Sequence, residues 1–129
     1  MSNALELHDS RVSFVDIADG LATIGFSHAY IHRSKGKPGK DRGTGWSQEA
    51  RLYLANAALL RPLPPLPGAI AEGYLEVGGV KLEPIPLPFK RKVAARLHLV
   101  LADGRTLEIA GEKPVIELSD PPIFLEEFS

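Results

Sequence analysis

Two copies of one turn signal constrain the fold of this chain more than any other feature. The tripeptide Ala-Asp-Gly occupies residues 18–20 and residues 102–104, and each copy lies between stretches in which apolar residues alternate with others. An Asp-Gly pair in that setting is typical of a β-hairpin. In the second copy, a three-residue loop brings the apolar residues of both strands onto one face, whereas a two-residue loop would mix apolar and polar residues. The predicted cross-strand pairs are Leu101 with Arg105, Leu99 with Leu107 and Leu97 with Ile109.

The same interpretation applies to the first copy of the signal. A three-residue loop of this kind ends on a glycine in the left-handed region, so we expect positive φ angles at Gly20 and Gly104. The predicted pairs of the first hairpin are Phe14 with Ile24 and Val12 with Phe26. The apolar faces of the two hairpins predict a core that contains Phe14, Ile24, Phe26, Leu97, Leu99, Leu107 and Ile109.

The composition is that of an ordinary globular protein, with 44% hydrophobic and 24% charged residues in a chain of 129. This length predicts a single β domain over residues 1–129. The formal net charge of −1 provides no overall field that would attract nucleic acid or a membrane surface. The lack of cysteine excludes disulfides, thiolate catalysis and thiolate metal sites. No apolar run approaches the ~20 residues of a membrane helix and no signal peptide is recognisable, so we expect a cytoplasmic protein.

Other segments also favour strands and turns. Residues 48–57 fit a helix or a strand, and we choose the strand because the neighbouring elements are strands. The pair Gly78-Gly79 indicates a two-residue hairpin, and the alternating prolines of residues 84–88 predict an edge strand or a wrapping loop. The other predicted elements are strands at 11–18, 21–32, 92–101, 105–110 and 115–118, a loop at 33–47, an extended proline-rich connection at 62–67, and a tail at 124–128 that is a strand or a helical turn. The predicted fold class is all-β, with antiparallel hairpins forming a sandwich or a partly open barrel.

The two ends of the chain resemble those of small uncharacterised bacterial domains. The opening reads Leu5-Glu6-Leu7-His8-Asp9-Ser10 and the close reads Phe124-Leu125-Glu126-Glu127-Phe128. The opening is also similar to the Phe-His-Asp-Ala-Glu string of an immunity-protein family from toxin–antitoxin-like competition systems. The resemblance is confined to these two segments. It implies a small β domain that binds a partner, and it supplies no catalytic residues.

A candidate metal site comes from histidines in the second predicted strand. His28, Tyr30 and His32 alternate along this strand and therefore share one face of the sheet. If the first hairpin continues in register, His8 lies opposite Tyr30 and Glu6 lies opposite His32. Imidazoles and a carboxylate at cross-strand distances suit zinc or another divalent ion. We therefore expect either a metal or catalytic site that uses His8, His28, His32 and Glu6, or histidines with a structural role.

A second candidate site is the glycine-rich segment that follows. Residues 33–46 contain five cationic residues and four glycines, with Asp41 as their acidic residue. Glycine-rich backbone exposes N–H groups that can cradle an anion, and the single tryptophan can stack on a base. The alternatives are a solvated, mobile loop and a contact with another protein. The candidate anion-binding residues are Arg33, Lys35, Lys37, Lys40, Arg42 and Trp46.

No catalytic motif of high specificity occurs in the sequence. The sequence therefore predicts a non-enzymatic binding or interaction domain of unknown partner. We expect a protein partner or a homodimer through an exposed edge strand, and neither nucleic acid nor a membrane. The alternatives are a metal-binding protein or metal-dependent enzyme that uses the three histidines, and a domain that contacts an anion or nucleic acid through residues 33–46.

Overall fold

The computed structural model describes residues 2–35 and 42–128, and every regular element in this part of the chain is a β-strand. The predicted all-β, antiparallel fold class is confirmed. Among the described residues no helix is long and apolar enough to cross a membrane. The strands are β1 (Ser2–Ala18), β2 (Leu21–Ser34), β3 (Gly43–Leu59), β4 (Gly68–Val77), β5 (Val80–Leu82), β6 (Ile85–Leu87), β7 (Phe89–Lys90), β8 (Ala94–Leu101) and β9 (Thr106–Phe128).

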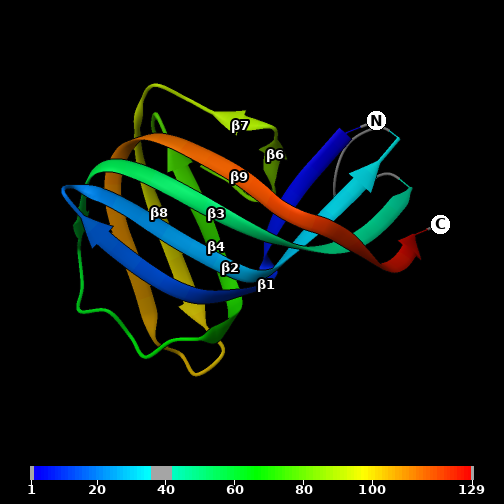
Figure 1. Ribbon diagram of the computed structural model, residues 1–129, viewed down its shortest axis with the longest axis horizontal. Coiled ribbons are helices and arrows are strands. Elements are labelled where there is room, and N and C mark those ends of the chain that lie inside the picture. Colours follow the sequence, from blue (N-terminus) through cyan, green and yellow to red (C-terminus); the bar gives the residue numbers. More distant parts are fainter. Residues whose placement is uncertain (1, 36–41, 129) are drawn as a thin grey trace.

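The nine described strands belong to one antiparallel sheet that returns on itself (Figure 1). The order is β5-β4-β8-β9-β3-β2-β1-β6, and β7 pairs with β9 beside this path. β4 also pairs with β1, where Arg11 lies opposite Ala69 and Val12 lies opposite Gly68. This short pairing connects β4, β8, β9, β3, β2 and β1 into a ring.

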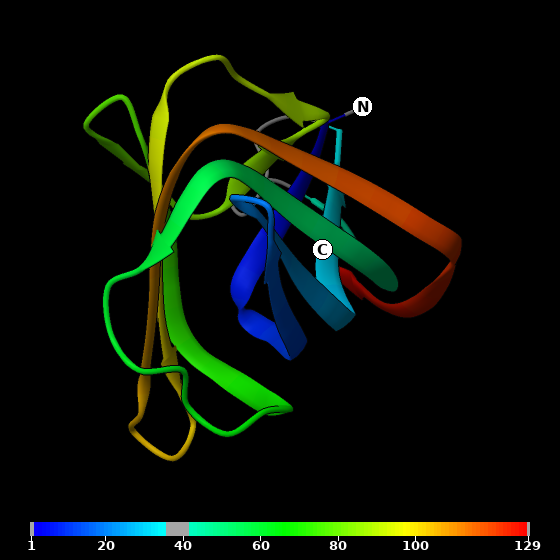
Figure 2. The same ribbon diagram turned by 60° about the vertical axis from the view of Figure 1, so that its left-hand side comes forward.

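Four long strands continue beyond the ring and form an extension. Figure 1 shows β1, β2, β3 and β9 running side by side towards the end of the molecule where both chain termini lie. Figure 2 shows β3 and β9 arching over from the ring into this extension. Register shifts interrupt the pairing of β1 with β2, of β2 with β3 and of β3 with β9. Such bulges bend strands and increase their twist, so the same four strands can belong to the ring and to the extension.

The hairpin between β8 and β9 has the predicted register. Leu99 pairs with Leu107, and Gly104 has a φ of +87° as expected for the last residue of the three-residue loop. The predicted hairpin between β4 and β5 is also confirmed, because Gly78 and Gly79 have φ angles of +57° and +84° between paired strands. The turn residues therefore predicted both hairpins correctly.

The turn of the first hairpin differs from its prediction. The loop has two residues instead of three, so Ala18 pairs directly with Leu21. Asp19 and Gly20 both have positive φ angles, of 51° and 80°. Two-residue loops with this backbone match the right-handed twist of paired strands, and aspartate tolerates the left-handed region better than most residues. The predicted positive φ at Gly20 is confirmed, whereas the predicted loop length is wrong.

A bulge farther along this hairpin moves Phe14 out of the core. Val12 pairs with Phe26 as predicted, but the register then shifts, and Phe14 pairs with Gly25 instead of Ile24. The Phe14 ring lies over the Gly25 backbone, where a Cβ atom would collide with it, and is 38% exposed. The predicted core position of Phe14 is wrong. The other six predicted core residues are buried.

The predicted loop at residues 33–47 is much shorter in the structure. β2 continues to Ser34 and β3 begins at Gly43, and Arg33 pairs with Thr44. Pairing with neighbouring strands on both sides satisfies this backbone and overrides the local preference of its glycines for irregular structure. The prediction of a strand at 48–57 is confirmed, because these residues belong to β3.

The last strand is longer than predicted. The expected strands at 105–110 and 115–118 and the tail at 124–128 are parts of β9, which continues through irregular backbone at Lys113 and Asp120. The proline-alternating segment 84–88 contains β6, which pairs with β1 at the end of the sheet order, so the predicted edge strand is confirmed. Every strand except β5 contributes side chains to the buried apolar cluster. Its burial stabilises the fold by roughly 1.5–3 kcal/mol for each large aliphatic side chain.

Candidate functional site

The extension of β1, β2, β3 and β9 has two faces with different chemistry. Successive side chains of a strand point to opposite faces. The cross-strand row of Arg33, Thr44 and Glu127 therefore lies on one face, and the neighbouring row that contains His32 and Gly45 lies on the other. The two predicted sites fall in this part of the molecule.

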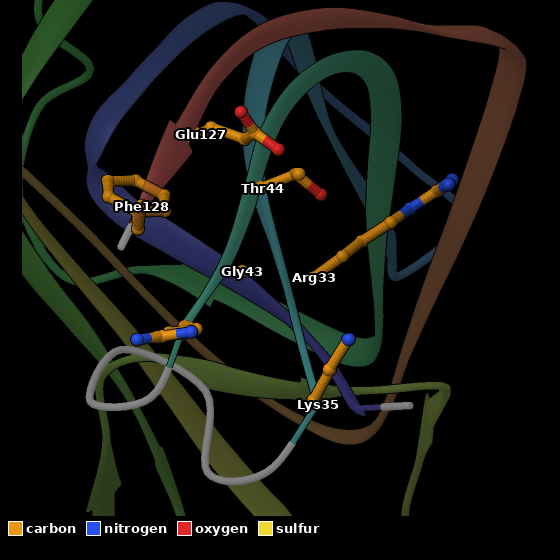
Figure 3. Close-up of a pocket in the computed structure, with 7 residues that line it drawn as sticks. Arg33, Lys35, Gly43, Thr44, Glu127 and Phe128 are labelled. Atoms are coloured by element: carbon orange, nitrogen blue, oxygen red, sulfur yellow. The ribbon is translucent and has the colours of Figure 1, made fainter.

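A cavity of about 510 Å³ lies where the extension ends (Figure 3). Its volume is in the range of small-molecule binding sites. Three of the lining side chains are cations and one is a carboxylate. Among residues 2–35 and 42–128, none of the three cations forms an ion pair with a carboxylate. The lining residues are Arg33, Lys35, Arg42, Gly43, Thr44, Glu127 and Phe128.

Trp46 positions Arg33 beside this cavity. The Arg33 guanidinium carbon lies 4.5 Å from the centre of the Trp46 ring, which is within the range of a cation–π contact. The Trp46 Nε1–H donates a 2.7 Å hydrogen bond to Thr44 Oγ1, and the ring meets Phe124 edge-on at 5.3 Å. Arg33 Nε is buried and has no hydrogen-bond partner in the described part of the chain. A buried donor of this kind is unfavourable until an acceptor reaches it.

The other predicted cations are placed in two ways. The Lys35 N–H donates a 3.3 Å hydrogen bond to the Arg42 carbonyl, so the two residues face each other where β2 ends and β3 begins. Lys37 and Lys40 lie outside the described residues. Thr44, Glu127 and Phe128 were not predicted, because their place depends on the register between β3 and β9, for which the sequence carries no local signal.

The predicted metal site contains a histidine–carboxylate cluster on β1 and β2. Glu6, His8 and Asp9 bring one ligand atom each within 4.8 Å of one another. His8 Nε2 lies 3.2 Å from Asp9 Oδ2 and 4.0 Å from Glu6 Oε2. On the other side of the same carboxylate, His32 Nδ1 lies 3.5 Å from Glu6 Oε1, and the His32 side chain is 6% exposed. The structure therefore gathers Glu6, His8 and His32, three of the four residues predicted for a metal site.

The fourth predicted residue, His28, is elsewhere. It is exposed, and within the described residues its ring contact is with Ser27, whose Oγ lies 3.3 Å from His28 Nδ1. The predicted register that placed Glu6 opposite His32 is wrong, because Glu6 pairs with Tyr30. The bulge between Glu6 and the middle of β1 breaks the simple continuation of the hairpin. The side chains of Glu6 and His32 meet although their backbones are not paired directly across the two strands.

The sequence did not reveal the contribution of Glu83. Its carboxylate accepts hydrogen bonds from the N–H groups of Leu7, at 3.1 Å, and His8, at 3.3 Å. Its Oε2 also lies 3.6 Å from His8 Nδ1. Burial raises the pKa of Glu83, although the backbone N–H of Leu7 and the charge of His8 act in the opposite direction. The nearest sequence signal was the alternation of prolines that follows Glu83. This pattern predicted an edge strand, but it did not predict that the strand pairs with β1.

Tyr30 lies between this cluster and β9. Burial raises the pKa of Tyr30 to about 12, and the carboxylates of Glu126, Glu6 and Asp9 reinforce the effect. Its hydroxyl crosses the backbone of Gly45, where a Cβ atom would collide with it. The glycine that favoured a loop in the sequence therefore makes room for a tyrosine in the sheet.

No family model, curated protein or solved structure matches this chain. The resemblance of its two ends to small bacterial domains stays a prediction, as do the expected protein partner, the homodimer and the cytoplasmic location. The function is therefore inferred from the side chains of the two sites.

Proposed function

We propose that this protein is a small binding protein whose ligand is an anion held in the cavity at the end of the extension. The observation that supports this proposal is the charge of the lining. Arg33, Lys35 and Arg42 surround the cavity, and no carboxylate pairs with them in the described part of the chain. Three cations and one carboxylate give the lining a net positive charge, which attracts an anion.

The lining also indicates the kind of anion. The Arg33 guanidinium has the planar fork that suits phosphate or carboxylate oxygens, and Thr44 adds a hydroxyl group. Phe128, whose ring stacks on His32 with centroids 4.8 Å apart, contributes an aromatic ring, while Glu127 limits the net charge of the lining to +2. An extended polyanion would be repelled by that carboxylate. We therefore favour a small ligand in which one phosphate or carboxylate group is joined to an apolar part.

Calorimetric titration with phenyl phosphate at low salt tests this function. The wild-type protein is expected to bind, and Arg33→Gln is expected to weaken binding about 10–100-fold, because a charged hydrogen bond is lost. Lys35→Gln and Arg42→Gln should weaken it less, as they remove more flexible charges. Increasing salt should reduce the affinity of the wild-type protein.

Lys81→Gln is the matched control, because Lys81 is a cation that lies over Tyr74, at 4.6 Å, and does not line the cavity. This variant should bind phenyl phosphate as the wild type does. Absence of binding to the wild-type protein would contradict the proposed function. Equal losses in Arg33→Gln and Lys81→Gln would show a general charge effect and would also contradict it.

A further inference from the structure

We propose that Glu6, His8 and Asp9 bind a divalent transition-metal ion of the Zn²⁺ type. Glu83 and His32 would orient the ligands without contacting the ion. Glu6, His8 and Asp9 do not line the cavity described above, and the two sites meet where the His32 ring stacks on Phe128, with ring centroids 4.8 Å apart. The inference is argued from the three ligand residues and does not depend on the proposed anion-binding function. The ligand set differs from the one that strand alternation predicted, since Asp9 takes part and His28 does not.

The spacing of the ligand atoms fits one ion. Zinc lies about 2.0–2.2 Å from nitrogen and oxygen ligands, which in tetrahedral geometry puts two ligand atoms about 3.4 Å apart. The two separations measured from His8 Nε2 are 3.2 Å to Asp9 Oδ2 and 4.0 Å to Glu6 Oε2. These values bracket the expected separation. All three ligand atoms lie within 4.8 Å of one another, so side-chain rotations would have to bring them together around an ion.

Glu83 gives His8 the orientation of a metal ligand. His8 Nδ1 faces Glu83 Oε2 at 3.6 Å, while His8 Nε2 faces the other two carboxylates. Glu83 is itself held by the N–H groups of Leu7 and His8. A proton on Nδ1, directed at a fixed carboxylate, leaves the Nε2 lone pair free for an ion. Metal-bound histidines almost always have such a partner on their second ring nitrogen.

His32 holds Glu6 from the side opposite His8. Its side chain is 6% exposed, and its Nδ1 lies 3.5 Å from Glu6 Oε1. Its Nε2 is buried without a hydrogen-bond partner among the described residues. A proton on Nε2 would be a buried donor with no acceptor, so the proton is best placed on Nδ1, facing Glu6. This arrangement occupies Oε1 of Glu6 and leaves Oε2 directed at His8.

Charge and access also suit a cation. When both imidazoles are neutral, the carboxylates of Glu6, Asp9 and Glu83 are a concentrated negative charge, which a divalent ion offsets. Glu6 is largely buried, but the side chains of His8 and Asp9 are 47% and 53% exposed, so an ion can enter from solvent. Mixed nitrogen and oxygen ligands favour Zn²⁺ and related transition metals over Ca²⁺ or Mg²⁺, which prefer oxygen alone.

Titration of the chelator-treated protein with ZnCl₂ in a calorimeter tests the site, and the visible absorption of added Co²⁺ reports its coordination. The wild-type protein should bind one equivalent. His8→Ala and Asp9→Asn should each weaken binding at least tenfold, and both residues are exposed enough for the variants to fold. Glu83→Gln should weaken binding about 10–100-fold, as is usual when a group behind a ligand is lost.

His28→Ala is the matched control, because it removes an exposed histidine of the same sheet that lies outside the cluster. It should bind Zn²⁺ as tightly as the wild type. No Zn²⁺ heat from the wild-type protein would overturn the proposal and leave the cluster as ion pairs. Unchanged binding in His8→Ala would overturn it too, and so would an equal loss in His28→Ala. Unchanged affinity in Glu83→Gln would overturn the role assigned to Glu83.

Discussion

Among single residues, Gly104 offers the cleanest test of the turn chemistry. Its φ angle is +87°, and a Cβ atom added there would have no heavy atom within 4 Å. Any cost of Gly104→Ala therefore comes from backbone conformation and not from a clash. We expect this change to lower the free energy of unfolding by about 1–3 kcal/mol, measured by chemical denaturation. Gly104→Asn should cost less, because asparagine tolerates positive φ better than alanine. Equal stability of the alanine variant and the wild type would contradict the turn assignment.

Tyr30 provides a pH-dependent test at the same scale. Burial raises its pKa to about 12, so the folded protein favours the neutral phenol. Its contribution to stability is therefore fully present below the ordinary tyrosine pKa near 10 and is lost as the pH rises towards about 12. The phenolate absorbance of the wild type minus that of Tyr30→Phe should show a titration step near pH 12. A step near pH 10 would show that Tyr30 is not buried in the way described.

For the strands, the contrast between Leu99 and Phe14 tests the register. Leu99 is fully buried, and Leu99→Ala should cost about 2–5 kcal/mol through lost burial and a residual cavity. Phe14 is the larger side chain but is 38% exposed over Gly25. Phe14→Ala should therefore cost less than Leu99→Ala in the same urea titration. The opposite order would return Phe14 to the core and would contradict the observed bulge.

The strands also show where sequence is informative. The two-glycine hairpin at 78–79 and the hairpin around Gly104 depend on turn residues and alternation within a few positions, and both were predicted correctly. The single strand from 106 to 128 was not predicted correctly. It continues through Lys113 and Asp120, whose positive φ angles are irregular for a strand. Its continuity depends on pairing with β3, whose partner residues lie fifty or more positions earlier in the chain. Long-range pairing of this kind overrides local propensity.

For the whole molecule, the sites follow from how the ring and its extension are connected. The cations at 33, 35 and 42 could be predicted from composition, because they cluster in one segment. Glu83, Glu127 and Phe128 could not, because they reach the sites only through the pairings of β6 with β1 and of β9 with β3. The histidine cluster was predicted in part. Side-chain alternation along a strand can be predicted from the local sequence, whereas the bulge in β1 depends on how β1 pairs with β2.

Mapping the bound anion on the protein is the sharpest test of the proposed anion site. In a ¹H–¹⁵N correlation spectrum at low salt, added phenyl phosphate should shift the backbone amides of Arg33, Thr44 and Glu127, which line the cavity from three neighbouring strands. The amide of Tyr74, beside the control cation Lys81, should stay unchanged. Saturable shifts confined to the cavity are the result that the proposed function predicts. No shifts, or shifts that spread over all exposed cations without saturation, would contradict it.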